Sequence, residues 1–100
     1  MKVKLVRDKI SVMPGNRETI RPANTLPGHQ LALVAKLHEE VGEVAKALTD
    51  PEEYADVLQA LLDLATISGV DFEDVLTAAR EKHARLGGFR RGMVLISQEP

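Results

Sequence analysis

Two pairs of acidic residues stand at the same three-residue spacing, one in the segment HEEVGEV and the other in PEEYADVL. The pairs are Glu40 with Glu43 and Glu53 with Asp56. Because residues three apart share one face of a helix, each segment presents two carboxylates together if it is helical. Four such carboxylates repel one another unless a cation lies among them, and Mg²⁺ suits a set of oxygen ligands, with Mn²⁺ as a second option. The spacing therefore predicts a metal site and metal-assisted phosphate chemistry.

The elements that must position these acids are predicted by apolar periodicity and by capping residues. Apolar residues at steps of three and four predict a helix from about Leu26 to Leu48. The sequence Thr-Asp-Pro, followed by two glutamates, predicts a second helix from Pro51 to about Ser68. A third apolar stripe follows Asp71 and ends before Gly87 and Gly88. Each acid pair thus falls on its own predicted helix.

The predicted fold is all-α, a small helical bundle of three main helices with an extended N-terminal arm and an extended C-terminal tail. The arm covers residues 1–12, and the segment 13–28 is an irregular loop rich in proline and glycine. With 100 residues and 44% apolar content, the chain fits a single domain, residues 1–100. Short helices with broad apolar faces in so small a chain indicate that subunits share part of the core. We expect at least a homodimer.

Composition excludes several classes of protein. The chain has no cysteine, so it uses neither disulfides nor thiolate-bound zinc, and this suits a reducing cytoplasm. A net charge of -2 and three aromatic residues argue against a nucleic-acid-binding surface. Charged residues interrupt the N-terminal segment, so neither a signal peptide nor a membrane span is expected there. We predict a soluble, unprocessed, cytoplasmic protein whose partner is a small molecule.

The second predicted helix is apolar almost all round, which is typical of a buried central helix, yet Glu53, Asp56 and Asp63 share one narrow stripe on it. Burying an unpaired carboxylate costs several kcal/mol, so these acids require cations opposite them, either a metal or basic side chains. Asp63 fits a salt bridge to Lys82 or Arg80 as well as it fits a metal role. A solvated acidic face is the common alternative for one Glu-x-x-Glu spacing, and the presence of two such pairs argues against it.

These motifs resemble those of the all-α nucleoside triphosphate pyrophosphohydrolases, which include MazG-like enzymes and phosphoribosyl-ATP pyrophosphohydrolase. The family signature is a Glu-x-x-Glu helix followed by a Glu-x-x-Asp helix. KLVRDKI at residues 4–10 and GGFRRGMVL at residues 87–95 are similar to the two ends of one MazG-like branch. Two features depart from the pattern: the connection from Glu43 to Glu53 is short, and Leu86 stands where an arginine is common.

The resemblance implies a function and a set of site residues. The four acids Glu40, Glu43, Glu53 and Asp56 would be catalytic and would hold Mg²⁺ ions on a nucleoside triphosphate. Water activated by the metal would attack at the α–β linkage and release a nucleoside monophosphate and pyrophosphate. The substrate-binding candidates are Arg7, Lys9, Asp63, Lys82 and Arg85.

The same resemblance implies a homodimer or homotetramer and favours a role in clearing the nucleotide pool. Base recognition is assigned to the loop from Met13 to Gly28 or to a neighbouring subunit. Two other functions stay open on the residues alone. One is a non-catalytic helical dimerisation module whose acids form salt bridges, and the other is a divalent-cation buffer without hydrolysis.

Overall fold

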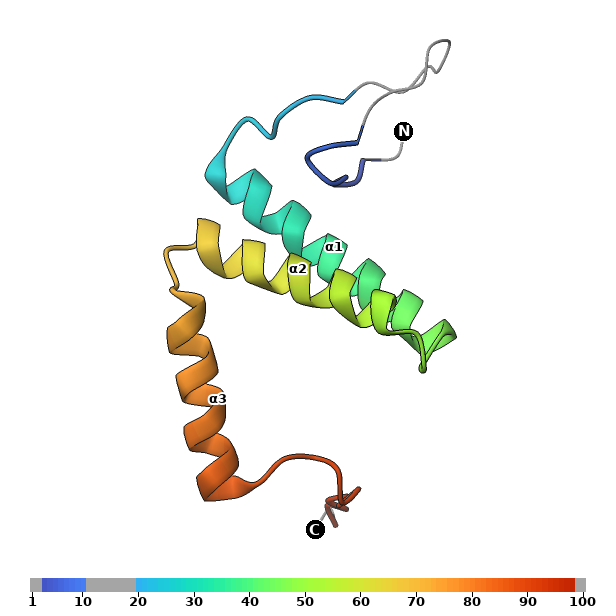
Figure 1. Ribbon diagram of the computed structural model, residues 1–100, viewed down its shortest axis with the longest axis vertical. Helices are drawn as coiled ribbons and strands as arrows, with labels where there is room; N and C mark the ends of the chain where they lie inside the picture. The colour runs from blue at the N-terminus through green and yellow to red at the C-terminus, as the bar shows by residue number, and fades with distance from the viewer. Residues whose placement is uncertain (1–2, 11–19, 99–100) are drawn as a thin grey trace. The chain divides into compact units, whose positions relative to one another are not determined.

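The computed structural model describes residues 3–10 and 20–98 of the chain. Within these ranges it contains three helices, α1 (Leu26–Lys46), α2 (Pro51–Ile67) and α3 (Phe72–Leu86), and no strand (Figure 1). The predicted all-α class is confirmed. None of the described helices is long and apolar enough to cross a membrane. The chain divides into two compact units, Met1–Val70 and Asp71–Pro100, and the assignment of residues 1–100 to one domain stays a prediction.

Helix α1 begins at a side-chain cap and ends two residues before the predicted position. The Thr25 hydroxyl oxygen accepts a hydrogen bond from the Gly28 N–H at 3.1 Å, which satisfies one of the free donors of the first turn. Ala47 leaves the helical conformation, with φ of -146°. Because a residue before proline is driven to extended geometry, Asp50 cannot continue a helix, and the chain must turn between Ala47 and Pro51.

Helix α2 starts at Pro51 as predicted. The Asp50 carboxylate caps it by accepting a hydrogen bond from the Glu52 N–H at 2.9 Å. Its other end is a Schellman motif, in which Val70 N–H donates to Ala65 O at 2.9 Å and Gly69 N–H donates to Thr66 O at 3.2 Å. Gly69 has φ of +78°, the left-handed conformation that this motif requires and that glycine adopts without strain.

Helices α1 and α2 pack side by side as an antiparallel hairpin (Figure 1). Gln30 Nε2 donates to Ser68 Oγ at 3.0 Å, which joins the beginning of α1 to the end of α2. The apolar residues buried in the described part of this hairpin are Leu33 and Ala60, whereas Leu58 is 54% exposed. The expectation of a buried second helix is thus not met in the single chain, since a two-helix hairpin covers one side of each helix. A core shared between subunits stays a prediction.

The second unit consists of α3 and the segment that follows it. The Asp71 carboxylate caps α3 by accepting from the Glu73 N–H at 2.9 Å, and Gly87, with φ of +80°, ends the helix as predicted. Residues 89–98 contain no helix or strand. Their large apolar side chains are exposed, with Phe89 at 99% and Leu95 at 90%.

Candidate functional site

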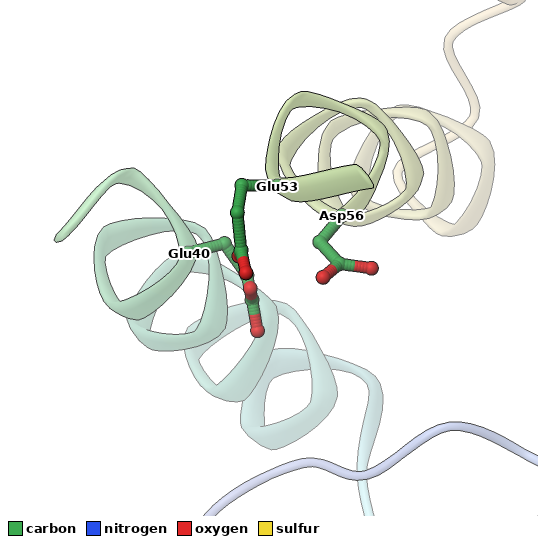
Figure 2. Close-up of side chains that lie close together, drawn as sticks. All are labelled: Glu40, Glu53 and Asp56. Carbon is green, nitrogen blue, oxygen red and sulfur yellow. The ribbon is translucent and has the colours of Figure 1, made fainter. Parts of the chain in front are cut away.

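Three of the four predicted metal ligands lie together between α1 and α2. Glu40, Glu53 and Asp56 each offer a carboxylate oxygen, and these atoms lie within 4.8 Å of one another. Figure 2 shows Glu40 from α1 and Glu53 and Asp56 from α2, with their carboxylates in the space between the two helices. Glu40 is 8% exposed and the other two are half-buried. We call these three residues the acid cluster, and its all-oxygen donor set suits a hard divalent cation.

Two basic side chains contact the acid cluster. Lys36 lies one turn before Glu40 on α1, and its Nζ is 3.0 Å from Glu40 Oε1. The guanidinium of Arg7, on the N-terminal arm, forms an ion pair with Asp56. Among residues 3–10 and 20–98 no ion pair includes Glu53. The protein therefore supplies cations to two of the three acids.

The surroundings of Glu53 disfavour its charge. Partial burial raises the pKa of the Glu53 carboxyl, and the negative charges of neighbouring acids raise it further. These neighbours are, in decreasing order of effect, Asp56, Asp50, Glu43 and Glu40. A cation held among these carboxylates would reverse this effect, because an opposite charge favours the ionised form.

The pKa of Lys36 is raised as well, but for a lysine this favours the charged form. Burial alone would lower the pKa of the Lys36 amine, but its hydrogen bond to Glu40 and the charges of Glu39 and Glu40 raise it overall. Lys36 thus stays protonated and pairs with the buried Glu40 carboxylate. Lys36 is not among the predicted site residues, although its position four residues before Glu40 is the spacing of a helical ion pair.

The fourth predicted ligand, Glu43, is not part of the acid cluster. Its side chain is 46% exposed, and its Oε1 lies 3.6 Å from Lys46 Nζ. Residues three apart on a helix differ by about 60° in direction, so when Glu40 points at α2, Glu43 points partly past it. The Glu43 charge nevertheless contributes to the raised pKa of Glu53.

A pocket of about 600 Å³ adjoins the acid cluster. The N-terminal arm, α1 and α2 line it, and its wall includes Glu40 and Asp56. The arm contributes Leu5–Lys9, which brings two predicted substrate-binding residues, Arg7 and Lys9, to the pocket. A concave space of this size with a few charged groups in its wall is typical of a small-molecule site.

The other predicted substrate-binding residues fall in different places. Asp63 on α2 lines the pocket and accepts two hydrogen bonds from Gln59 Nε2, both at 3.1 Å. Lys82 and Arg85 lie on α3 in the second unit, so their roles, and a salt bridge from Asp63 to Lys82 or Arg80, stay predictions.

The predicted base-recognition loop, Met13 to Gly28, lies outside the described residues from 13 to 19. The pocket wall also includes a histidine, His29, which is not among the predicted site residues. It follows the described end of that loop, in the first turn of α1.

Comparison with known proteins gives one partial similarity. A dATP/dGTP diphosphohydrolase of Cyanophage S-2L is 49% identical to this chain over 47 residues, a stretch that covers 45% of each protein. The match therefore spans less than half the length of that relative. No protein-family model matches the chain, and no solved structure matches it. Over part of its length, the chain is similar to a protein named for the hydrolysis of deoxynucleotides.

Proposed function

We propose that this protein is a divalent-metal-dependent nucleoside triphosphate pyrophosphohydrolase of the MazG-like class. The observation that carries the proposal is the acid cluster itself: three carboxylates from two helices lie within 4.8 Å of one another beside a pocket with basic residues in its wall. The partial similarity to a dATP/dGTP diphosphohydrolase supports the same class of substrate. The reaction would cleave the α–β linkage and give a nucleoside monophosphate and pyrophosphate, in clearance of the nucleotide pool.

The residues present fit a divalent metal ion. Glu53 has a raised pKa among neighbouring negative charges, and a cation placed between it, Glu40 and Asp56 would remove that repulsion. The donors are all carboxylate oxygens, which suit Mg²⁺ or Mn²⁺ better than softer metals. When bound, such an ion would neutralise phosphate charge and polarise the phosphoryl group under attack.

The other roles in the proposed reaction are assigned to side chains of the acid cluster and the pocket. Glu40, Glu53 and Asp56 would hold the metal, and Lys36 would fix the position of the Glu40 carboxylate through its 3.0 Å contact. Arg7 and Lys9, which line the pocket, would bind phosphate oxygens by charge-assisted hydrogen bonds.

We assign proton transfer to Glu43, which is 46% exposed and lies on α1 three residues after Glu40, outside the acid cluster. A water oxygen would bond to the α-phosphorus while the bond from that phosphorus to the bridging oxygen breaks. The electron pair of that bond leaves with pyrophosphate, and the Glu43 carboxylate accepts the proton of the water.

The direct test is a panel of nucleoside triphosphates, together with phosphoribosyl-ATP, incubated with Mg²⁺ and assayed for pyrophosphate. Release of pyrophosphate with a matching monophosphate would support the proposal. Release of inorganic phosphate alone, or of nothing from any substrate, would contradict it.

Metal binding is tested separately by thermal melting with and without millimolar Mg²⁺ or Mn²⁺. A ligand that binds only the folded protein raises the midpoint, by an amount that corresponds to about 2.7 kcal/mol when its concentration is 100 times Kd. No change in the midpoint for the wild-type protein would exclude the metal site.

A non-catalytic dimerisation module is the second candidate function, and the ion pairs of the acid cluster favour it. Lys36 and Arg7 already contact Glu40 and Asp56, as they would in a purely structural network. The exposed apolar residues of the hairpin, such as Leu58, would then be covered by a partner. This function predicts neither Mg²⁺-dependent stabilisation nor turnover. The melting experiment and the pyrophosphate assay therefore both distinguish it from the hydrolase. Gel filtration would test the homodimer or homotetramer that either function allows.

A further inference from the structure

The pocket extends away from the acid cluster along the hairpin. On α2 its wall runs from Asp56 through Ala60 and Asp63 to Ile67, steps of three and four that follow one helical face. On the antiparallel α1 it runs back from Glu40 to His29. Asp63 lies seven residues after Asp56, which is about 10 Å along the helix axis. This separation matches the reach of a nucleotide from its α-phosphate to the far edge of its base.

The far part of the pocket combines an apolar wall with an exposed carboxylate that is hydrogen-bonded within α2. Leu33 on α1 and Ala60 on α2 are buried, at 5% and 6% exposure, and both line the pocket. The Asp63 carboxylate accepts from Gln59 Nε2 at both oxygens, at 3.1 Å each. A single donor shared between the two oxygens orients the carboxylate and leaves further lone pairs free on each. Asp63 therefore presents two adjacent acceptors at an exposed position of the pocket wall.

Two adjacent carboxylate oxygens favour a base that carries two neighbouring hydrogen-bond donors. Guanine carries two neighbouring donors on one edge, the N1–H and the 2-amino group, which a carboxylate can accept together in a bidentate, charge-assisted pair. Adenine has an acceptor at N1, which would face a carboxylate oxygen with no proton between them. Hypoxanthine keeps the N1–H but lacks the 2-amino donor.

We propose that Asp63, oriented by Gln59, reads the base in this pocket and makes the protein selective for guanine nucleotides. The inference rests on the proposed function, which puts the phosphates of the substrate at the acid cluster and therefore its base toward Asp63. It assigns specificity to the described face of α2 rather than to the loop from Met13 to Gly28.

A purely structural role for the pair makes a different prediction. Gln59 and Asp63 stand four residues apart, where side-chain hydrogen bonds stabilise a helix modestly. Loss of that bond would change the melting midpoint slightly and would affect all substrates equally. Only base reading changes the ratio between substrates that differ in a single amino group.

The test compares dGTP, dITP and dATP with the wild-type protein, Asp63→Asn and a matched control, Glu81→Gln, which removes an exposed helical carboxylate outside the pocket. In the wild type, kcat/KM for dGTP should exceed that for dITP by about tenfold, mainly through KM, because one charge-assisted hydrogen bond is lost. In Asp63→Asn, which replaces one acceptor by a donor, this ratio should fall toward one. Glu81→Gln should keep the wild-type ratio.

Equilibrium binding of the same three nucleotides, by calorimetry without turnover, keeps the two proposals separate. Selective binding of dGTP that Asp63→Asn abolishes would support base reading even if no pyrophosphate were released. Pyrophosphate release with equal kcat/KM for dGTP and dITP would overturn base reading by Asp63 and leave the hydrolase proposal intact. An unchanged dGTP-to-dITP ratio in Asp63→Asn would overturn it as well.

Discussion

The two acid pairs have the same spacing in sequence but different settings in the structure. On α2 both members, Glu53 and Asp56, join the acid cluster, whereas on α1 Glu40 joins it and Glu43 stays outside. The difference lies in where each pair sits relative to the facing helix. Glu53 and Asp56 are both half-buried, whereas on α1 Glu40 is buried at 8% exposure and the Glu43 side chain is 46% exposed. Spacing places two side chains on one face of a helix, but helix packing decides which of them meet a partner.

The cations near the two pairs differ in the same way. The α1 acids are contacted by lysines of their own helix, Lys36 at Glu40 and Lys46 at Glu43. On α2, Asp56 is paired with Arg7 of the N-terminal arm, and Glu53 has no ion-pair partner within the described ranges. The α1 pair thus carries local charge compensation, whereas the α2 pair depends on groups brought from elsewhere. Three substitutions and one double-mutant cycle test what this difference means, and we order them by expected effect.

The largest effect is expected for Glu40→Gln, which removes the buried member of the acid cluster. Turnover should fall to background, and the Mg²⁺-dependent rise of the melting midpoint should disappear. Loss of a group that only supports a metal ligand costs about 10- to 100-fold in affinity or activity, so loss of a direct ligand should exceed this. Pyrophosphate release and melting with and without Mg²⁺ are the measurements. A variant that still gained stability from Mg²⁺ would remove Glu40 from the ligand set.

The substitution Glu43→Gln asks whether the acid outside the cluster has a separate role. Turnover should fall by about 10²- to 10⁴-fold, the usual cost of losing a positioned general base. The fold should be intact and the Mg²⁺-dependent stabilisation should be retained, because Glu43 is not among the three clustered acids. Lys46→Ala, which removes only the ion-pair partner of Glu43, is the matched control and should keep most activity. Full activity in Glu43→Gln would exclude Glu43 from the mechanism.

These expectations show what local sequence pattern can predict here. Thr25, Asp50 and Asp71 are capping residues whose effect is local, so the three helices could be predicted within two residues at each end. Three of four acids also meet as the helical spacing suggests. The contact of Arg7 with Asp56 spans 49 positions in the chain, and no local pattern encodes the path of the arm to α2. The exclusion of Glu43 likewise depends on how α1 is rotated toward α2, which periodicity fixes only to within about one residue.

A smaller effect is expected for Glu53→Gln in the absence of metal. The raised pKa of Glu53 means that its contribution to stability is fully present below the ordinary value of 4.5 and is lost as pH rises through the folded-state value. Without metal at neutral pH, Glu53→Gln should therefore melt at a higher temperature than the wild type. The difference should close as the pH is lowered below 4.5.

Addition of Mg²⁺ should reverse the order of these two proteins, since only the wild type retains all three clustered carboxylates. Glu52→Gln, which removes a carboxylate from the same first turn of α2, is the control and should not show this reversal. Melting curves at several pH values with a chelator or with Mg²⁺ supply the measurement. If Glu53→Gln is the less stable protein at neutral pH without metal, the surroundings of Glu53 are not repulsive as described.

The smallest effect is expected for the ion pair between Lys4 and Glu39, because Glu39 lies on α1 outside both the acid cluster and the pocket wall. Lys4 Nζ of the arm lies 3.3 Å from Glu39 Oε1, and this hydrogen bond is the main reason that the pKa of Glu39 is lowered. Such a carboxylate stabilises the fold above the ordinary value of 4.5 and loses this contribution as pH falls through its lowered pKa. Both side chains are substantially exposed, so the pair should contribute about 0.2–1 kcal/mol, and less at high salt.

A double-mutant cycle of Lys4→Ala and Glu39→Gln, measured by urea unfolding at low and high salt, gives the coupling energy of this ion pair. A coupling well above this range, or one that salt does not weaken, would mean that the arm is held to α1 by more than a surface ion pair, and that α1 as well as α2 depends on the arm to compensate its acids.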